Sequence, residues 1–66
     1  MDIGDHVSWK TSQGQTEGKI VDRKTKDFQL DKQHFKASAD EPKYIVESDK
    51  TGARAAHAES ALTKIK

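Results

Sequence analysis

Apolar and polar residues alternate near the start of the chain in the way that a β-strand requires. Val7 and Trp9 lie two positions apart, so they fall on one face of an extended strand. The polar side chains of His6 and Ser8 fall on the other face. Residues 11–14 have the composition of a turn, and a second β-branched run follows them. The pattern predicts the first hairpin of a very small all-β barrel.

The second strand is predicted over residues 15–23. Thr16, Gly18 and Ile20 share one of its faces. A glycine inside a strand marks a bulge, a sharp bend or a close approach of backbone. Because the strands of a tight barrel must bend, we predict a bend at Gly18 rather than the close approach of a ligand.

Two shorter strands are predicted in the middle of the chain. Residues 28–30 alternate apolar and polar side chains, and residues 34–37 do the same. The polar residues 23–27 connect the second strand to this region, and residues 31–33 have the composition of a turn.

Residues 43–48 form the most strand-like run of the chain. Pro42 cannot donate a ladder hydrogen bond, which places it at the start or the edge of a strand. Tyr44 and Val46 are the predicted core pair of this strand. Ile45 faces the opposite way and leaves that assignment open.

The last part of the chain predicts a hairpin and a closing turn. Gly52 can take the positive φ that the hairpin loop needs, and residues 54–57 return as the last strand. Ser60 is a candidate cap for a single helical turn over residues 61–63, with Leu62 plugging the end of the barrel.

Size and composition limit the class of protein. The 66 residues allow one domain with one thin core, so we expect a stability of only a few kcal/mol. The absence of cysteine excludes disulfides and cysteine-based zinc sites. A closed barrel suits such a chain because it buries one face of every strand and leaves few open edges.

Charge and hydropathy bear on partners and location. Twelve basic and eleven acidic residues nearly cancel, which argues against a strong nonspecific grip on nucleic acid. The apolar residues are patterned and not scattered, so the high charged fraction does not indicate disorder. No apolar run approaches the length of a membrane span or a signal peptide, and we expect a cytoplasmic protein.

Three stretches carry a family resemblance. The opening residues, followed by Gly-Lys-Ile-Val at 18–21, are similar to SH3-like barrels of the Tudor, chromo-barrel and KOW type. More narrowly, the chain resembles the hypervirulence-associated Tudor-like domain family at 4–9 (Gly-Asp-His-Val-Ser-Trp), 40–48 (Asp-Glu-Pro-Lys-Tyr-Ile-Val-Glu-Ser) and 50–57 (Lys-Thr-Gly-Ala-Arg-Ala-Ala-His) with 60–62 (Ser-Ala-Leu). The resemblance covers nearly the whole chain. It implies a compact Tudor-like barrel, and it brings no catalytic residue or cofactor.

Aromatic residues raise the question of a methyl-lysine or methyl-arginine reader. Such a reader needs several aromatic side chains that converge on one rim as a cation–π cage. The chain has Trp9, Phe28, Phe35 and Tyr44. A core this thin needs most of them inside, so packing is the favoured role. Trp9 and Tyr44 are the ones we expect to reach the surface, because their polar tips need a partner or water.

A group of cations follows the second strand and its loop. They are Lys19, Arg23, Lys24 and Lys26, with Lys36 and Arg54 as possible additions. Such a face permits contact with phosphates, and interleaved aromatics would permit base stacking. Glu17, Asp22 and Asp27 lie among the cations and weaken their field. A solvated face is favoured, with weak nucleic-acid contact as the alternative.

The three histidines are candidate metal ligands, but none is spaced with another as a local chelate. His6 and His34 lie on faces opposite apolar residues and are predicted to point outward and apart. His57 is predicted to hydrogen-bond the closing turn near Ser60, with a ligand or pH-switch role as the alternative.

Catalytic motifs are missing from the sequence. There is no cysteine, no nucleophile elbow and no glycine-rich phosphate loop. Asp40 and Glu41 are adjacent carboxylates, and adjacent side chains of an extended chain point apart. The sequence therefore predicts a protein that is not an enzyme.

The pattern as a whole predicts an all-β, five-stranded SH3-like or Tudor-like barrel over residues 1–66, with a short C-terminal helical turn. The predicted function is a small interaction module that binds a protein or peptide at the barrel rim, by groove docking or strand addition. We predict no cofactor and no metal; the sequence does not give the oligomeric state, and a monomer is the default. The predicted partner-binding residues are Trp9, Arg23, Lys24, Lys26, Tyr44 and Arg54. The alternative, a nucleic-acid-binding barrel, acts through Lys19, Arg23, Lys24, Lys26 and Arg54.

Overall fold

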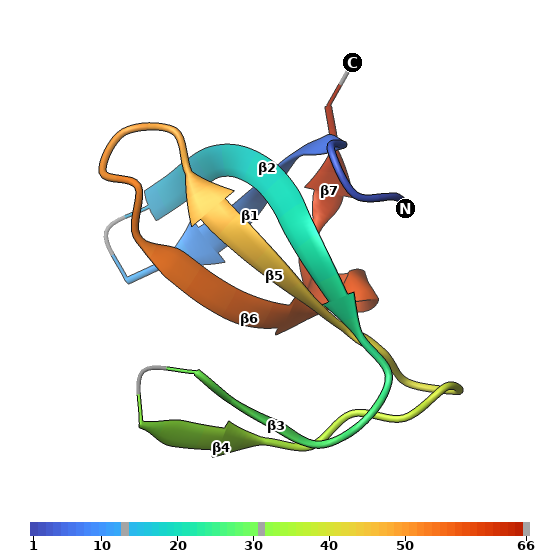
Figure 1. Cartoon of the computed structure of the whole chain (residues 1–66). Helices are drawn as coiled ribbons and strands as arrows, with labels where there is room; N and C mark the ends of the chain where they lie inside the picture. Colours follow the sequence, from blue (N-terminus) through green and yellow to red (C-terminus); the bar gives the residue numbers. More distant parts are fainter. Residues whose placement is uncertain (13, 31, 66) are drawn as a thin grey trace.

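The computed structural model describes residues 1–12, 14–30 and 32–65, which form an almost entirely β structure (Figure 1). Gln13 and Asp31, in the predicted turns, and Lys66 lie outside the described residues. Within the described part of the chain no helix is long and apolar enough to cross a membrane. The elements are β1 (His6–Thr11), β2 (Gly14–Lys24), β3 (Phe28–Leu30), β4 (Gln33–Phe35), β5 (Lys43–Ser48), β6 (Arg54–Ala58), the 3₁₀ turn η1 (Glu59–Ala61) and β7 (Thr63–Lys64).

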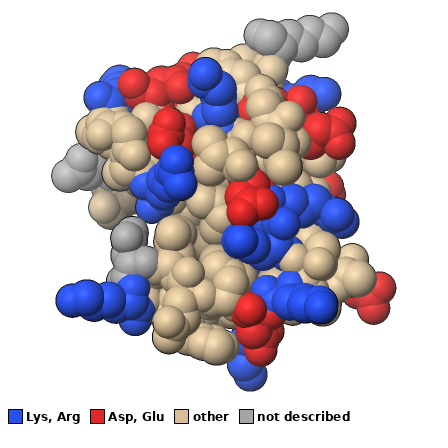
Figure 2. Space-filling view, in the orientation of Figure 1, with Lys and Arg blue, Asp and Glu red and all other residues tan. Residues whose placement is uncertain are grey.

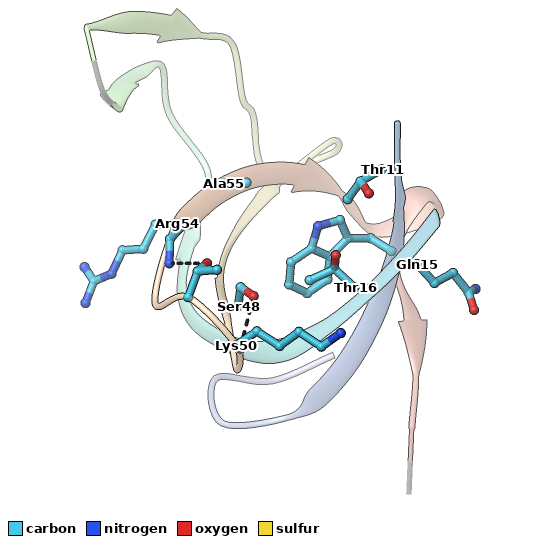
Figure 3. A pocket seen from close by; sticks show the side chains of 10 residues that line it. Thr11, Gln15, Thr16, Ser48, Lys50, Arg54 and Ala55 are labelled. Atoms are coloured by element: carbon cyan, nitrogen blue, oxygen red, sulfur yellow. Dashed lines mark hydrogen bonds between the residues drawn. The ribbon is translucent and has the colours of Figure 1, made fainter. Parts of the chain in front are cut away.

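Five strands form one sheet in the order β6-β5-β2-β1-β7, and β3 and β4 form a separate hairpin. The long strand β2 pairs antiparallel with β1 on one side and with β5 on the other. A register shift between Ile20 and Asp22 marks a bulge, and bulges increase the local twist. The sheet curls into a ring, which Figure 3 shows end-on. The strand order and the curled sheet confirm the predicted all-β, five-stranded barrel with a C-terminal helical turn.

The interior of the ring holds one apolar cluster. Alternation along β1 turns Val7 and Trp9 inward, and alternation along β5 turns Tyr44 and Val46 inward. Leu62, just after η1, is buried against them, as the sequence predicts. Burial of large apolar side chains contributes roughly 1.5–3 kcal/mol each, so this small cluster is the main stabilising feature of the ring.

Ile45 occupies a second, outer apolar layer. Its side chain is 4% exposed, yet it lies outside the central cluster because it faces the other side of β5. It shares a surface pocket with Val21 of β2 and with Phe28 and Leu30 of β3. The β3–β4 hairpin therefore lies over the outer face of the sheet. Tyr44 and Val46 are buried in the central cluster and Ile45 in this outer layer, so three consecutive residues of β5 are buried.

The hairpin has a short apolar contact of its own. Phe28 and Phe35 face each other across β3 and β4, with ring centroids 5.4 Å apart and planes inclined by 18°. Offset stacking of this kind stabilises a cross-strand pair. The strand predicted over 34–37 is shifted to Gln33–Phe35, and the β5 prediction of 43–48 is confirmed.

The structure differs from the sequence-based description in three places. Ser8, on the polar face of β1, is only 8% exposed because Glu17 of β2 and Thr63 of β7 flank it in the sheet. Ser60 does not cap the closing turn, which spans Glu59–Ala61 and follows Ala58 without a side-chain cap. The two-residue strand β7 is too short to leave an alternating pattern in the sequence.

Gly18 allows a close approach within the protein. A Cβ built at this position would meet the carbonyl oxygen of Glu47 and would lie 2.9 Å from Cη2 of Trp9. The bulge that bends β2 falls after Ile20, not at the glycine. Gly52, in contrast, has φ of 72° in the β5–β6 loop, as the sequence predicts.

Candidate partner-binding groove

Two surface pockets meet at Trp9, and together we call them the Trp9 groove. They lie between the β1–β2 hairpin and β6, and Figure 3 shows the first of them from close by. The first pocket, about 350 Å³, is lined by Trp9, Thr11, Gln15, Thr16, Ser48, Lys50, Thr51, Ala53, Arg54 and Ala55. The second, about 410 Å³, shares Trp9 and Gln15 and adds Lys10, His57, Ser60, Ala61 and Thr63.

Trp9 is the buried floor of this groove. It faces inward from β1, opposite Thr16 of β2, and is 6% exposed. The His57 ring of β6 lies against it at a centroid distance of 5.7 Å and an inclination of 39°. The expectation that Trp9 reaches the surface is therefore wrong for most of its ring. A small indole edge remains to meet an occupant of either pocket.

Tyr44 is not part of the groove. It is 3% exposed within the core, and its hydroxyl donates to the carbonyl oxygen of Met1 at 3.5 Å. The phenol thus finds its polar partner at the N-terminus and not in solvent. The expectation that Tyr44 reaches the surface is wrong, because a protein backbone group supplies what water would have supplied.

The predicted cations separate into two groups. Arg54 lines the groove, and its Nε donates to Oε1 of Glu47 at 3.2 Å. Arg23, Lys24 and Lys26 lie at the other end of β2 and in the loop that follows it. Of the six residues predicted to bind a partner, the structure therefore brings Trp9 and Arg54 together.

The cations beyond β2 have acidic neighbours. Nζ of Lys24 lies 2.9 Å from Oδ2 of Asp22, and the backbone N–H of Arg23 donates to Oδ1 of the same carboxylate at 2.7 Å. The Lys24 hydrogen bond, followed by that of Arg23, holds the pKa of Asp22 below its usual value. In Figure 2 blue and red side chains are interspersed over the face shown, without a continuous basic patch.

The lining of the Trp9 groove is positively charged. Lys10, Lys50 and Arg54 line it, and its described lining contains no Asp or Glu. The side chain of Lys50 extends from the β5–β6 loop toward the β1–β2 hairpin (Figure 3). Lys10, Gln15 and Thr16 are not predicted by the sequence pattern. The register of the first hairpin could have identified these residues, because it pairs Trp9 with Thr16 and Lys10 with Gln15.

An aromatic cage is not present in the described residues. Trp9 is the one Phe, Tyr or Trp side chain that lines the groove, where its other neighbours are mainly hydroxyl, amide and alanine side chains. Phe28 and Phe35 stack on each other in the β3–β4 hairpin instead. A cation–π cage requires aromatic faces around one point, and the described lining of the groove supplies one such face.

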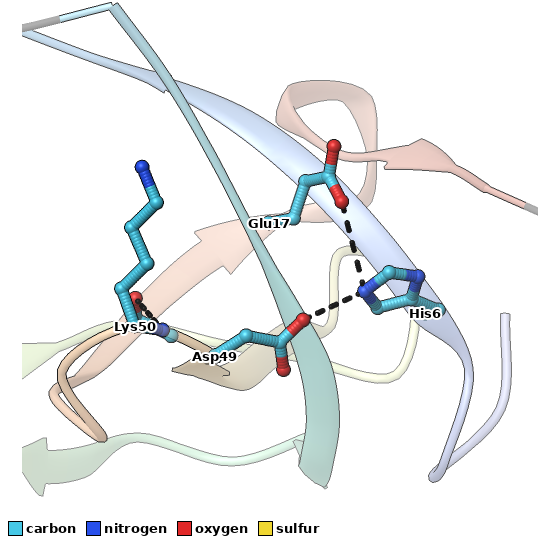
Figure 4. Close-up of polar contacts among 5 residues, drawn as sticks. His6, Glu17, Asp49 and Lys50 are labelled. Atoms are coloured by element: carbon cyan, nitrogen blue, oxygen red, sulfur yellow. Dashed lines mark hydrogen bonds and ion pairs between the residues drawn. The ribbon is translucent and has the colours of Figure 1, made fainter.

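His6 lies in an acidic cluster on the outer surface (Figure 4). Its Nε2 is 2.8 Å from Oδ2 of Asp49 and 3.9 Å from Oε1 of Glu17. His34 has a looser contact of 3.9 Å with Asp27. A metal-binding group of three or more His, Cys, Asp or Glu does not occur in the described part of the chain. His6 and His34 point outward and lie in separate clusters, as the sequence predicts.

The predicted hydrogen bond of His57 to the closing turn is not present: within the described residues no hydrogen bond joins its side chain to η1. The ring packs against Trp9 instead. Burial lowers the pKa of His57, because the charged imidazolium loses hydration in this position. His57 therefore binds its proton more weakly in the folded chain than in the unfolded chain.

This difference predicts a pH dependence. Stability from neutral His57 is fully present above its unfolded pKa, and it is lost as the pH falls toward the folded value. We expect urea denaturation to show a lower midpoint at about pH 5 than at about pH 7.5, and we expect His57→Gln to reduce that difference. His34→Gln is the matched control at an exposed histidine. An unchanged pH difference in His57→Gln would contradict the burial of this ring.

Comparison with known proteins gives one match. The model of the TUDOR domain of hypervirulence associated proteins matches residues 4–62. No curated protein and no solved structure matches the chain. The match spans both strands of the first hairpin, β5, β6 and the closing turn, which are the elements that build the ring and the groove. The chain therefore belongs to the hypervirulence-associated Tudor-like domain family.

Proposed function

We propose that the protein is a small interaction module that binds a polypeptide partner in the Trp9 groove. The supporting observation is the groove itself: two connected pockets share one indole floor and are bordered by the β1–β2 hairpin and by β6. Together they are large enough for a short stretch of extended chain. Tudor domains typically bind proteins or nucleic acids, which agrees with a binding role.

The groove offers little for chemical catalysis. Its described lining contains hydroxyls, an amide, three cations and His57, and no carboxylate. A serine or threonine nucleophile needs a base held within hydrogen-bond distance and a third group that orients it. His57 instead packs against Trp9 with its ring tilted by 39°. A non-enzymatic role also agrees with Tudor-like domains in general.

The alternative partner is a nucleic acid bound through Lys19, Arg23, Lys24, Lys26 and Arg54. Two observations disfavour it. Lys24 and Arg54 are paired with Asp22 and Glu47, which reduces the positive field that phosphates need. Of the five cations only Arg54 lines the Trp9 groove, so the other four do not act together with an aromatic platform there.

A blocked groove tests the polypeptide proposal. Ala53 is exposed and lines the first pocket, so Ala53→Phe fills the pocket without disturbing the core. Ala39→Phe adds the same side chain at an exposed loop position remote from the groove. We expect peptides selected from a random display library on the full chain to bind the Ala39→Phe variant normally. The same peptides should bind the Ala53→Phe variant at least about tenfold more weakly.

A salt series distinguishes the two partner classes. Short single- and double-stranded oligonucleotides are titrated into the chain at several salt concentrations. Failure to select any peptide, together with oligonucleotide affinity that falls steeply with salt and is insensitive to Ala53→Phe, would support the nucleic-acid alternative. Peptides that bind both phenylalanine variants equally would place the binding site outside the groove.

A further inference from the structure

Strand β6 presents an open edge of the sheet. It is the first strand in the order β6-β5-β2-β1-β7 and pairs with β5 on one side. Its other side has no backbone–backbone hydrogen bond within the described residues. An unpaired edge is a template for another extended chain, because each free N–H and C=O can continue the ladder.

The alternation of hydrogen bonds along β6 identifies the backbone N–H and C=O groups that point away from β5. In an antiparallel pair, every second residue directs both its N–H and its C=O toward the partner strand, and the residues between direct theirs away. The N–H of Ser48 donates to the carbonyl oxygen of Ala53 at 2.9 Å, so the backbone groups of Ala53 point toward β5. Alternation continues along β6, and the residues whose backbone groups point away from β5 are Arg54, Ala56 and Ala58.

The edge lacks the features that normally protect one. Natural edge strands carry inward charges, proline or a bulge to prevent further pairing. β6 reads Arg-Ala-Ala-His-Ala and pairs with β5 in continuous register from Glu47 to Lys43. Its three alanines also leave room for the side chains of a neighbouring strand.

The Trp9 groove runs beside this edge. Both pockets include residues of β6: Arg54 and Ala55 line the first, and His57 lines the second. A chain that pairs with β6 would therefore direct alternate side chains into the groove, over the Trp9 edge. Edge and groove together form one site for an extended segment.

Charge identifies the chemistry of that segment. Lys10, Lys50 and Arg54 line the groove without a carboxylate among its described lining, although the whole chain has nearly balanced charge. Within the described residues Lys10 and Lys50 form no salt bridge. Both are available to a carboxylate of a partner.

We infer that β6 accepts an extended, acidic segment of a partner protein as an added strand, whose alternate side chains enter the Trp9 groove. The inference rests on the proposed function and specifies the partner. It favours a polypeptide over a nucleic acid, because the outward N–H and C=O groups of β6 are both matched by another extended backbone, whereas phosphate oxygens can only accept. Affinity then comes from the backbone ladder, and selectivity comes from the acidic side chains.

Amide hydrogen exchange tests the strand addition. The probe is a short synthetic peptide that alternates valine with glutamate, added to the isotope-labelled full chain. We expect the amides of Arg54, Ala56 and Ala58 to gain protection of about tenfold or more, because they acquire acceptors. The amides of Ala55 and His57 already face β5 and should change little. This alternation is specific to an added strand.

Further controls separate the contribution of the backbone from that of the charge. A peptide of the same sequence, N-methylated at every second residue, loses one set of donors and should bind at least about tenfold more weakly. A valine–lysine peptide should not bind. The Lys10→Glu/Lys50→Glu double variant should lose about tenfold in affinity for the glutamate peptide, whereas the exposed control pair Lys26→Glu/Lys36→Glu should not.

The outcomes distinguish this inference from the proposed function. Peptide binding that shifts the Trp9 indole signal but leaves the amides of Arg54, Ala56 and Ala58 unprotected would overturn strand addition and keep groove binding. Equal binding of the lysine peptide would overturn the acidic specificity. If these amides become protected without peptide as the protein concentration rises, the edge pairs with a second copy of the chain, and the inference is overturned. Failure of the glutamate peptide alone to bind would also overturn it.

Discussion

Trp9→Ala is expected to unfold the chain, or nearly so. The indole supplies the largest side chain of the central cluster and contacts both the His57 ring and the Gly18 position. Truncation of a buried Trp costs about 3–5 kcal/mol, through lost transfer energy and the cavity left behind. A domain of this size has a stability of only about that magnitude. Urea denaturation followed by far-UV circular dichroism measures the change.

Two further variants make this prediction specific. Trp9→Phe retains most of the apolar volume and should stay folded, with a smaller loss of stability. Phe35→Ala removes an aromatic ring from the β3–β4 hairpin and should cost less than Trp9→Ala, because Phe35 is only partly buried. If Trp9→Ala remains folded with its denaturation midpoint unchanged, the indole is a surface residue and the assignment of Trp9 to the core is wrong.

Gly18→Ala is the second large effect. The new methyl group would meet the backbone carbonyl of Glu47, which is held in place by the pairing of β2 with β5, and the ring of Trp9. Because backbone cannot rotate out of the way as a side chain can, β2 and β5 must separate. Overpacking of this kind costs about 1–3 kcal/mol, and the lower unfolded-state entropy of alanine offsets less than about 1 kcal/mol of it.

The matched control for Gly18→Ala is Lys19→Ala. Lys19 is the next residue of the same strand and is exposed, so its change should stay within about 0.5 kcal/mol. Thermal or urea denaturation of both variants measures the contrast. Equal stability of Gly18→Ala and the wild-type chain would mean that the strands do not approach each other as closely as the structure shows.

The sequence predicts the central cluster because burial follows a period of two. Val7 and Trp9 on β1, and Tyr44 and Val46 on β5, are correctly assigned from alternation alone. Ile45 breaks the simple pattern, because its outer face is buried by a hairpin that belongs to a different part of the chain. Burial of that kind depends on long-range packing, and a local pattern does not contain it.

The groove is harder to predict than the core. In the sheet order β5 separates β6 from β2, and β5 and β2 separate it from β1, so no pairing rule relates Arg54 to Gln15 or Thr11. They line one pocket because the sheet curls. Three of the predicted cations are close together in the sequence: Arg23, Lys24 and Lys26. They lie at the end of β2 that is away from the groove. Adjacency in sequence is a poor guide to a site that the curvature of a sheet creates.

The signal of the Trp9 indole tests the central claim most directly. The chain has one tryptophan, so the indole N–H gives a single assigned resonance at the floor of the groove. In a nuclear magnetic resonance titration with a selected peptide, we expect this resonance and the amides of residues 50–55 to shift together and to saturate at one affinity. Shifts confined to residues 23–26, with the indole resonance unmoved, would contradict the account.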